Sequence, residues 1–499
     1  MTEDRKLPAW LASAGIAAAL AGFVVFSFAQ RWALLSASPF PLGVDGYFYP
    51  VQLRGLLESG ELHYAASPLA FWLLAPFAAA TDPIIGAKLG ASVYGALIAV
   101  PAYGVGVHLG RGRGPGLVAS AIATFSAGSF YLTIEFVKNG IGLTVALTAL
   151  WLVLRALTSP TRPRIVLALI AILAALLAHK MAAGLIVAIA IPATVAEATA
   201  RTRLRGRRLL EVLGVLALAV IVLVILGLVA PQRFLSPTDL ALLGDAFSGE
   251  ADWSLPASRT LRLGHEPLLA AIAAVLAAIA LVVDRHRRPA RLAAVSWVAV
   301  GLALVIAIPW LAVTDSQGLA MRLRIVAFVP LALCVAIALG SALRLLPKPG
   351  PAVACTVLAA IAALRVSGDR REGVVEMHPA LVAGALALPA LPPDTTVVIP
   401  ERHLVFMVAW YARVPVSLRP DDLPVDRRVR LLPGAFVELG SPLDDALLAI
   451  RARTELPPVI GLHPYHPNGF VLVPEVTWQI VLGRLPPSER GRLAAWPVR

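Results

Sequence analysis

The chain has 499 residues, of which 58% are hydrophobic and only 15% are charged. A soluble domain is nearer half apolar and a quarter charged, so this composition excludes an ordinary globular protein and indicates a polytopic membrane protein. The net charge of +13 does not point to nucleic acid, because the basic residues cluster in short loops between apolar runs. Cys334 and Cys355 lie inside apolar runs and form neither a disulfide framework nor a metal-binding pattern.

The first apolar run follows Arg5 and Lys6 and ends near Ala29. It is about 20 residues long and lacks a clear cleavage site, which predicts an uncleaved first span rather than a signal peptide. Runs of similar length recur along the chain. The sequence predicts eleven spans, at residues 9–29, 84–109, 115–134, 139–157, 164–179, 181–199, 209–230, 267–283, 292–313, 322–345 and 351–366.

The first outer loop, residues 30–83, is polar and rich in aromatic residues. Within it, the apolar run 67–80 is too short to cross the hydrocarbon core and lies between Pro68 and Pro83, so we expect an interfacial helix. With a cytoplasmic N-terminus, the inner loops then carry roughly twice as many Lys and Arg residues as the outer loops. This bias supports the orientation.

The chain changes character after the last apolar run. Residues 1–366 are predicted to form the transmembrane domain, whereas residues 367–499 are richer in charge and proline and have no run long enough to span. Within the second part, 395–399 and 470–473 read as strands and 401–411 as a short helix. We expect a small α/β domain, which eleven spans place on the extracytoplasmic side.

Candidate catalytic acids stand in two of the predicted outer segments. Asp45, in Val-Asp-Gly-Tyr-Phe-Tyr, follows the first span, and a carboxylate at a membrane edge is costly unless it is hydrated, paired or used. Such an acid suits deprotonation of an acceptor hydroxyl or, less well, a divalent metal. Glu135 is the second acid, near the turn between the third and fourth spans.

Candidate substrate-binding residues lie in the same outer segments. Aromatic faces suit sugar rings, and Lys and Arg suit a phosphate. These candidates are Tyr47, Tyr49, Arg54, Lys138, Asn139, His179, Lys180, Arg322 and Arg324.

Each candidate also has a plain structural interpretation. Asp45 fits a solvated helix cap, and Glu135 and Lys138 are spaced for a local ion pair. Lys180 fits a snorkelling side chain at a hydrated hairpin. Arg322 and Arg324 fit interfacial anchors, and the acids of the long loop 231–266 fit ordinary solvated carboxylates.

Several of these segments together resemble the GT-C superfamily of membrane glycosyltransferases, which includes protein O-mannosyltransferases, aminoarabinose transferases and the catalytic subunit of oligosaccharyltransferase. Asp45 stands where that family has an acid in its first outer loop, and Ser67-Pro-Leu-Ala-Phe-Trp72 matches its interfacial helix. Glu135 to Asn139 stands at its second polar motif, and Arg322 or Arg324 at its late basic residue. The chain departs from the family in having Gly46 and Asn139 where acids are frequent, and it lacks a Trp-Trp-Asp motif.

The resemblance implies transfer of a sugar from a polyprenyl-phosphate-linked donor to a glycan, lipid or protein acceptor on the outer face of the membrane. No cofactor is expected, and Asn139 weakens the case for a metal at Asp45. The implied location is the bacterial inner membrane, with multiple spans and an extracytoplasmic C-terminal domain. Two alternatives stay open: a non-catalytic GT-C-like scaffold, and a lipid or sugar transporter or flippase, which the scarcity of mid-span charges and of repeats disfavours.

Overall fold

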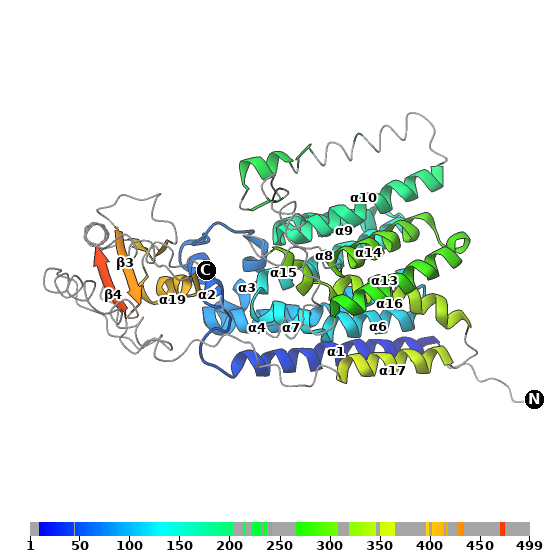
Figure 1. The fold of residues 1–499 in the computed structure, drawn as a ribbon, viewed down its shortest axis with the longest axis horizontal. Helices are drawn as coiled ribbons and strands as arrows, with labels where there is room; N and C mark the ends of the chain where they lie inside the picture. The colour runs from blue at the N-terminus through cyan, green and yellow to red at the C-terminus, as the bar shows by residue number, and fades with distance from the viewer. Residues whose placement is uncertain are drawn as a thin grey trace, which may run out of the picture. The chain divides into compact units, whose positions relative to one another are not determined.

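The computed structural model describes most of the apolar part of the chain and selected segments of the rest (Figure 1). The described residues are 9–43, 45–202, 214, 221–222, 224–231, 233–234, 236, 239, 241, 266–307, 319–345, 350–364, 396–398, 402–413, 416–417, 428–433 and 470–474. Most of the predicted span 209–230 and of the loop 231–266 lies outside these residues.

The chain divides into two compact units that interleave in sequence. The first contains Met1–Ala37, Tyr64–Thr81 and Ile85–Gly373, and the second contains Ser38–His63, Asp82–Ile84 and Val374–Arg499. The part of the first outer loop from Ser38 to His63 therefore belongs with the C-terminal segments. The predicted boundary at residue 366 divides the chain at a single position, and it stays a prediction.

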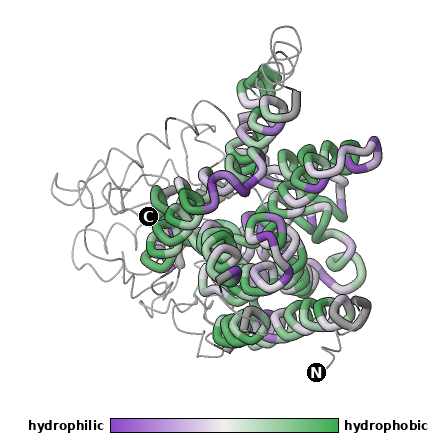
Figure 2. The backbone as a smooth tube through the Cα atoms, turned by 90° about the vertical axis from the view of Figure 1, so that its right-hand side faces the viewer, coloured by the Kyte–Doolittle hydropathy of each residue, from purple (hydrophilic) through white to green (hydrophobic). Residues whose placement is uncertain are grey.

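The secondary-structure elements of the first unit are all helices among its described residues. Its helices are α1 (Ala9–Ser36), α3 (Leu69–Ala80), α4 (Pro83–Leu97), α5 (Ala99–Gly110), α6 (Arg113–Phe125), α7 (Ala127–Ile134), α8 (Val137–Thr158), α9 (Arg162–Ala178), α10 (Lys180–Thr202), α13 (Glu266–Val283), α14 (Ala290–Ala307), α15 (Leu319–Ile325), α16 (Phe328–Ala342) and α17 (Gly350–Leu364), with short 3-10 turns η1 (Arg285–Arg287) and η2 (Leu343–Leu345). Figure 2 shows these helices roughly end-on, with much of their length in the green of hydrophobic residues.

Several of these helices are long and apolar enough to cross a membrane. Four such segments occur among the described residues, and a fifth is obtained if the bent pair α6–α7 counts as one span. The four are Ser13–Ser36, Pro83–Gly110, Val137–Thr158 and Glu266–Val283. Shorter apolar helices accompany them, so the chain has the elements of an integral membrane protein, while the number eleven stays a prediction.

Besides 84–109, which is divided at Ile98 into α4 and α5, two predicted spans are not continuous helices. The run 115–134 is bent by 42° between α6 and α7, where Ser126 has an extended backbone. The run 322–345 is divided into α15 and α16 by a turn at Val326 and Ala327. Sequence periodicity did not reveal either break, because the residues directly next to each break are apolar.

Small residues face the helix contacts and large aliphatic residues face outward. On α9 the buried side chains are Ala168, Ala171, Ala175 and Ala178, and the large exposed ones are Ile165, Val166, Leu167, Leu169, Ile170 and Leu173. On α13 alanines are likewise buried while Ile272, Leu276 and Ile279 are exposed. A water-soluble helix would show the reverse pattern, whereas close packing of small residues is typical of helices in lipid.

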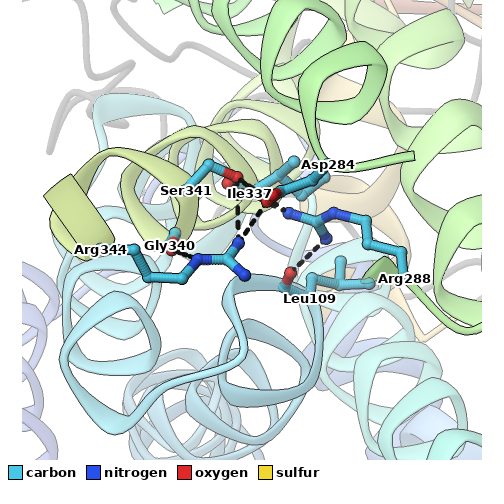
Figure 3. A network of polar contacts seen from close by, with 7 residues as sticks. All are labelled: Leu109, Asp284, Arg288, Ile337, Gly340, Ser341 and Arg344. Atoms are coloured by element: carbon cyan, nitrogen blue, oxygen red, sulfur yellow. Dashed lines mark hydrogen bonds and ion pairs between the residues drawn. The ribbon is translucent and has the colours of Figure 1, made fainter. Parts of the chain in front are cut away.

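A polar network holds α5, α16 and the α13–α14 connection together (Figure 3). Arg288 donates to the Leu109 carbonyl at 2.8 Å, and Asp284 accepts from the Ser341 hydroxyl at 2.7 Å and from Arg344. Burial raises the pKa of Asp284, but the Ser341 hydrogen bond and the charges of Arg344 and Arg288 outweigh it, so the net pKa is lowered. The network is therefore an ionised anchor at one end of the bundle.

The second unit contains a four-stranded sheet, and one helix lies between its first two strands in chain order. Its strands are β1 (Thr396–Val398), β2 (Val416–Ser417), β3 (Arg428–Pro433) and β4 (Phe470–Pro474), in the order β2-β1-β3-β4. β1 pairs in parallel with β2 and β3, and β3 pairs antiparallel with β4. The parallel β1–β2 pair is connected through α19 (Arg402–Ala412), as a parallel crossover requires. Among its described residues this unit also contains helix α2 (Phe48–Ser59).

Candidate functional site

The bend between α6 and α7 leaves helix ends inside the first unit, and two buried charged residues satisfy them. Arg31 of α1 has no exposed surface and donates to the Thr124 carbonyl at 3.0 Å, near the end of α6. Its guanidinium also bonds to the hydroxyls of Ser129 and Thr133 and lies 3.8 Å from the Phe130 ring centroid. A cation at the negative end of a helix dipole is favourable.

Glu266 serves the other side of the same bend. Its carboxylate, at the start of α13, accepts from the backbone amides of Ala127 and Gly128 at 2.6 and 3.2 Å. These amides form the positive end of α7, where an anion is favoured. Gly128 is required there, because a Cβ at this position would collide with the Ile325 carbonyl at the end of α15. The bend is therefore in contact with residues of three other helices, α1, α13 and α15.

The α7–α8 connection carries the predicted acid and its neighbours. Glu135 caps the C-terminal end of α7 and is 4% exposed. Lys138 and Asn139 lie in the first turn of α8 and are partly exposed. Glu135 is thus a buried carboxylate at the end of a helix whose other end is fixed by Glu266, and not a solvated loop residue.

Three cations, here termed the cation group, act electrostatically on His179 at the α9–α10 connection. His179 is the single extended residue between the two helices, and its side chain packs on α8, where a Cβ on Gly142 would lie 2.6 Å from the His179 Cβ. The charges that act on His179 are those of Lys138, Arg322 and Lys180. Three predicted binding residues, one each from α8, α10 and α15, therefore lie within electrostatic range of a fourth, His179.

Arg322 and Arg324 occupy different surroundings on α15. Arg322 is partly exposed, and its guanidinium lies 5.3 Å from the Phe136 ring centroid in the α7–α8 connection. Arg324 is buried, next to the α15–α16 turn. Arg322 thus lies beside the α7–α8 connection, whereas Arg324 is buried.

Lys180 has an ion-pair partner that sequence reasoning did not single out. Its ammonium lies 3.1 and 3.0 Å from the two carboxylate oxygens of Asp239. Asp239 also accepts from the backbone amide and hydroxyl of Ser236 at 2.8 and 2.7 Å. The spacing Ser236-x-x-Asp239 matches a helix capping box. This pattern could have indicated that Asp239 is held in a fixed position within the loop.

Asp45 lies in the second unit, in the turn that precedes α2, and is half-buried. Its carbonyl accepts from the Phe48 amide at 3.0 Å, and the Gly46 amide donates to Gly43 at 3.1 Å. A Cβ on Gly46 would collide with the Leu42 carbonyl, so the turn has no room for a side chain there. This explains why glycine follows Asp45 in place of the acid frequent in the resembling family.

Three predicted substrate-binding residues beside Asp45 are engaged by the C-terminal part of the chain or buried. Tyr47 is 1% exposed, and its hydroxyl lies 2.9 Å from that of Tyr411 in α19; burial and this hydrogen bond raise its pKa. Arg54 donates to the carbonyls of Trp410 and Ala409 at 2.6 and 3.0 Å. Tyr49 is buried. These contacts favour a supporting role, and direct substrate contact by these residues stays a prediction.

No group of three or more His, Cys, Asp or Glu side chains suited to hold a metal occurs among the described residues. A metal at Asp45, which the sequence supports only weakly, stays untested by this observation.

Comparison with known proteins identifies the fold. No protein-family model matches the chain, and no curated protein matches it. Among solved structures, ArnT from Cupriavidus metallidurans bound to undecaprenyl phosphate is similar at 13% identity and a TM-score of 0.54, covering 92% of this chain and 98% of ArnT. The apo form of ArnT gives 15% identity, a TM-score of 0.51, and coverage of 92% and 99%.

A second solved structure shows the same likeness. The archaeal oligosaccharyltransferase AglB from Archaeoglobus fulgidus, in complex with an inhibitory peptide and a dolichol-phosphate, is similar at 11% identity with a TM-score of 0.52. The match covers 81% of this chain and 65% of AglB. ArnT and AglB are GT-C glycosyltransferases. The resemblance in fold to this superfamily, expected from the sequence, is therefore confirmed.

Proposed function

We propose that this chain is a membrane glycosyltransferase that transfers a sugar from a polyprenyl-phosphate donor to an acceptor on the outer face of the membrane. The observation that carries the proposal is that the charges of Lys138, Lys180 and Arg322 all act on His179, which packs on α8 at the α9–α10 connection. Three cations at helix ends suit a phosphate. The similarity in fold to structures that hold undecaprenyl phosphate and dolichol-phosphate supports the same ligand class.

The proposed roles follow from chemistry and placement. Lys138, Lys180 and Arg322 bind the donor phosphate, and Glu135 with Asn139 positions donor or acceptor. Asp45 is the proposed general base for the acceptor hydroxyl, because a half-buried carboxylate is the group suited to that step. Arg324 is buried and contributes through the charge it places at the end of α15.

The proposed topology follows the sequence prediction. Eleven spans place the ends of α7, α9 and α10 with the cation group on the outer side, together with a C-terminal α/β domain. The network of Asp284, Arg288 and Arg344 then lies at the cytoplasmic side of a bacterial inner membrane. The acceptor is a glycan, lipid or protein.

The test is binding of undecaprenyl phosphate to the purified protein in lipid nanodiscs. Lys180→Ala and Arg322→Ala should each weaken binding about tenfold, because each removes a charge-assisted contact. The matched control is Arg113→Ala, which removes an exposed arginine at the start of α6 and should leave binding unchanged. Equal affinity in all four proteins would remove the phosphate role of the cation group.

Transfer is tested in the same preparation. Asp45→Asn should bind undecaprenyl phosphate like the wild type and lose the movement of labelled sugar out of the lipid fraction of native membranes, because an amide accepts no proton. Full transfer by this variant would leave the chain without its proposed base. Binding with no transfer by the wild type would favour a flippase or a scaffold.

A further inference from the structure

The Lys180–Asp239 pair connects the cation group to the loop that follows the predicted span 209–230. Both side chains are 24% exposed, so the pair is partly accessible. Lys180 is the first residue of α10, where a helix dipole disfavours a cation and favours an anion. An anion next to Lys180 is therefore stabilised twice, by the ammonium and by the helix end.

The loop holds the Asp239 carboxylate in position. Ser236 donates its amide and hydroxyl to one carboxylate oxygen, and its own hydroxyl accepts from the Asp239 amide at 3.4 Å. This is the reciprocal pattern of a capping box. Upstream, the Arg233 carbonyl accepts from the Ser67 hydroxyl at 3.0 Å, which fixes the loop to the chain entering α3.

A helix cap alone explains the Ser236 bonds but leaves the Lys180 contact unexplained. A capping carboxylate needs only backbone partners. Asp239 in addition presents both oxygens to Lys180, at 3.1 and 3.0 Å from its ammonium. The carboxylate thus occupies an anion position of the cation group.

We propose that Asp239 is a positioning residue that sets the affinity of the site for a lipid phosphate, acting through Lys180. With no phosphate bound, Asp239 neutralises Lys180 and holds it at the start of α10. An arriving phosphate takes the ammonium in exchange, so the carboxylate lowers affinity and favours release. This inference rests on the proposed function of the cation group.

The test is Asp239→Asn, with undecaprenyl phosphate as the probe and nanodisc-embedded full-length protein. The asparagine oxygen still accepts from Ser236, so the cap is retained while the competing charge is removed. Binding should become about three- to tenfold tighter, as expected for loss of a partly exposed ion pair that competes with the ligand. Asp82→Asn removes the same charge from another helix start and should leave the affinity unchanged.

A double variant separates action through Lys180 from a merely structural effect. In Lys180→Ala protein, adding Asp239→Asn should change the affinity no further. Unchanged or weaker binding in Asp239→Asn alone, or equal tightening in both backgrounds, would overturn the inference. If Asp239→Asn fails to fold, Ser236→Ala takes its place, because it removes the hydroxyl that helps hold the carboxylate beside Lys180, while the backbone amide of residue 236 still donates, and it should also tighten binding.

Two controls identify the ligand chemistry and keep the two proposals apart. Undecaprenol, which lacks the phosphate, should bind equally to wild type and Asp239→Asn; tighter binding of undecaprenol to the variant would overturn a charge mechanism. Inorganic phosphate should compete more weakly than the lipid, and equal competition would assign the site to a free anion. Absence of any undecaprenyl phosphate binding by the wild type contradicts the proposed function itself, whereas wild-type binding that Asp239→Asn does not tighten contradicts only the role of Asp239.

Discussion

Arg31 shows how one side chain can decide the shape of a helix to which it does not belong. It lies on α1, yet its guanidinium satisfies the Thr124 carbonyl and the hydroxyls of Ser129 and Thr133 on both sides of the α6–α7 bend. A fully buried cation is costly unless such partners surround it. Glu266 completes the arrangement with the opposite charge at the opposite helix end.

Arg31→Met should destabilise the protein by about 3 kcal/mol, because it leaves a buried carbonyl and two hydroxyls without their charged donor. The measurement is the midpoint of thermal unfolding in detergent. Arg113→Met, which changes an exposed arginine, should shift the midpoint little. Similar midpoints for the two variants would show that the Arg31 contacts do not contribute to stability.

At the scale of elements, packing in the first unit depends on small residues where helices meet. α5 and α16 approach so closely that a Cβ on Gly340 would collide with the Gly110 carbonyl. The Arg288 network fastens the same ends, since it bonds to carbonyls of both helices. Close backbone approach of this kind is how helices associate where lipid replaces water.

Gly340→Ala should therefore destabilise the protein by about 1–3 kcal/mol, since α5 and α16 must separate to admit the methyl group. Gly301 in α14 is the matched control, because no atom lies within 4 Å of a Cβ built there. Gly301→Ala should be neutral or slightly stabilising. Thermal unfolding of both variants in the same detergent decides the matter, and equal shifts would argue against a tight α5–α16 contact.

At the scale of the whole molecule, the division into units does not follow the order of the sequence. Ser38–His63 belongs to the second unit, where Arg54 of α2 donates to the end of α19 and lies over the Trp410 ring at 4.6 Å. Phe48 and Phe406 add a ring contact with centroids 5.0 Å apart. The turn that carries Asp45 is thus part of the unit that contains the C-terminal segments.

Arg54→Met should loosen α2 and α19 together, because it removes two hydrogen bonds and a cation–π contact but keeps the apolar stem. Amide hydrogen exchange should quicken about tenfold or more in both helices, with no change in α8 or α13. Faster exchange confined to α2 would indicate that α19 is held independently of Arg54.

The sequence alone determined that the chain is a helical membrane protein, because long apolar runs bounded by basic loops can be recognised without knowledge of the fold. It also located β1, α19 and β4 to within a residue or two, and it indicated the GT-C-like fold from the segments around Asp45, Ser67 and Glu135. These properties depend on local composition and spacing. Sequence therefore suffices for them.

Only the tertiary structure decided which residues share a neighbourhood. Arg31 and Glu266 contact the α6–α7 bend from positions distant in sequence, and no local sequence pattern predicts these contacts. The pairing of Lys180 with Asp239 and of Arg54 with α19 arises in the same way, from contacts across 59 and more than 350 positions. Hydrophobic periodicity carries no information about such contacts, because a charged side chain is stabilised by whichever partner the packed helices bring to it.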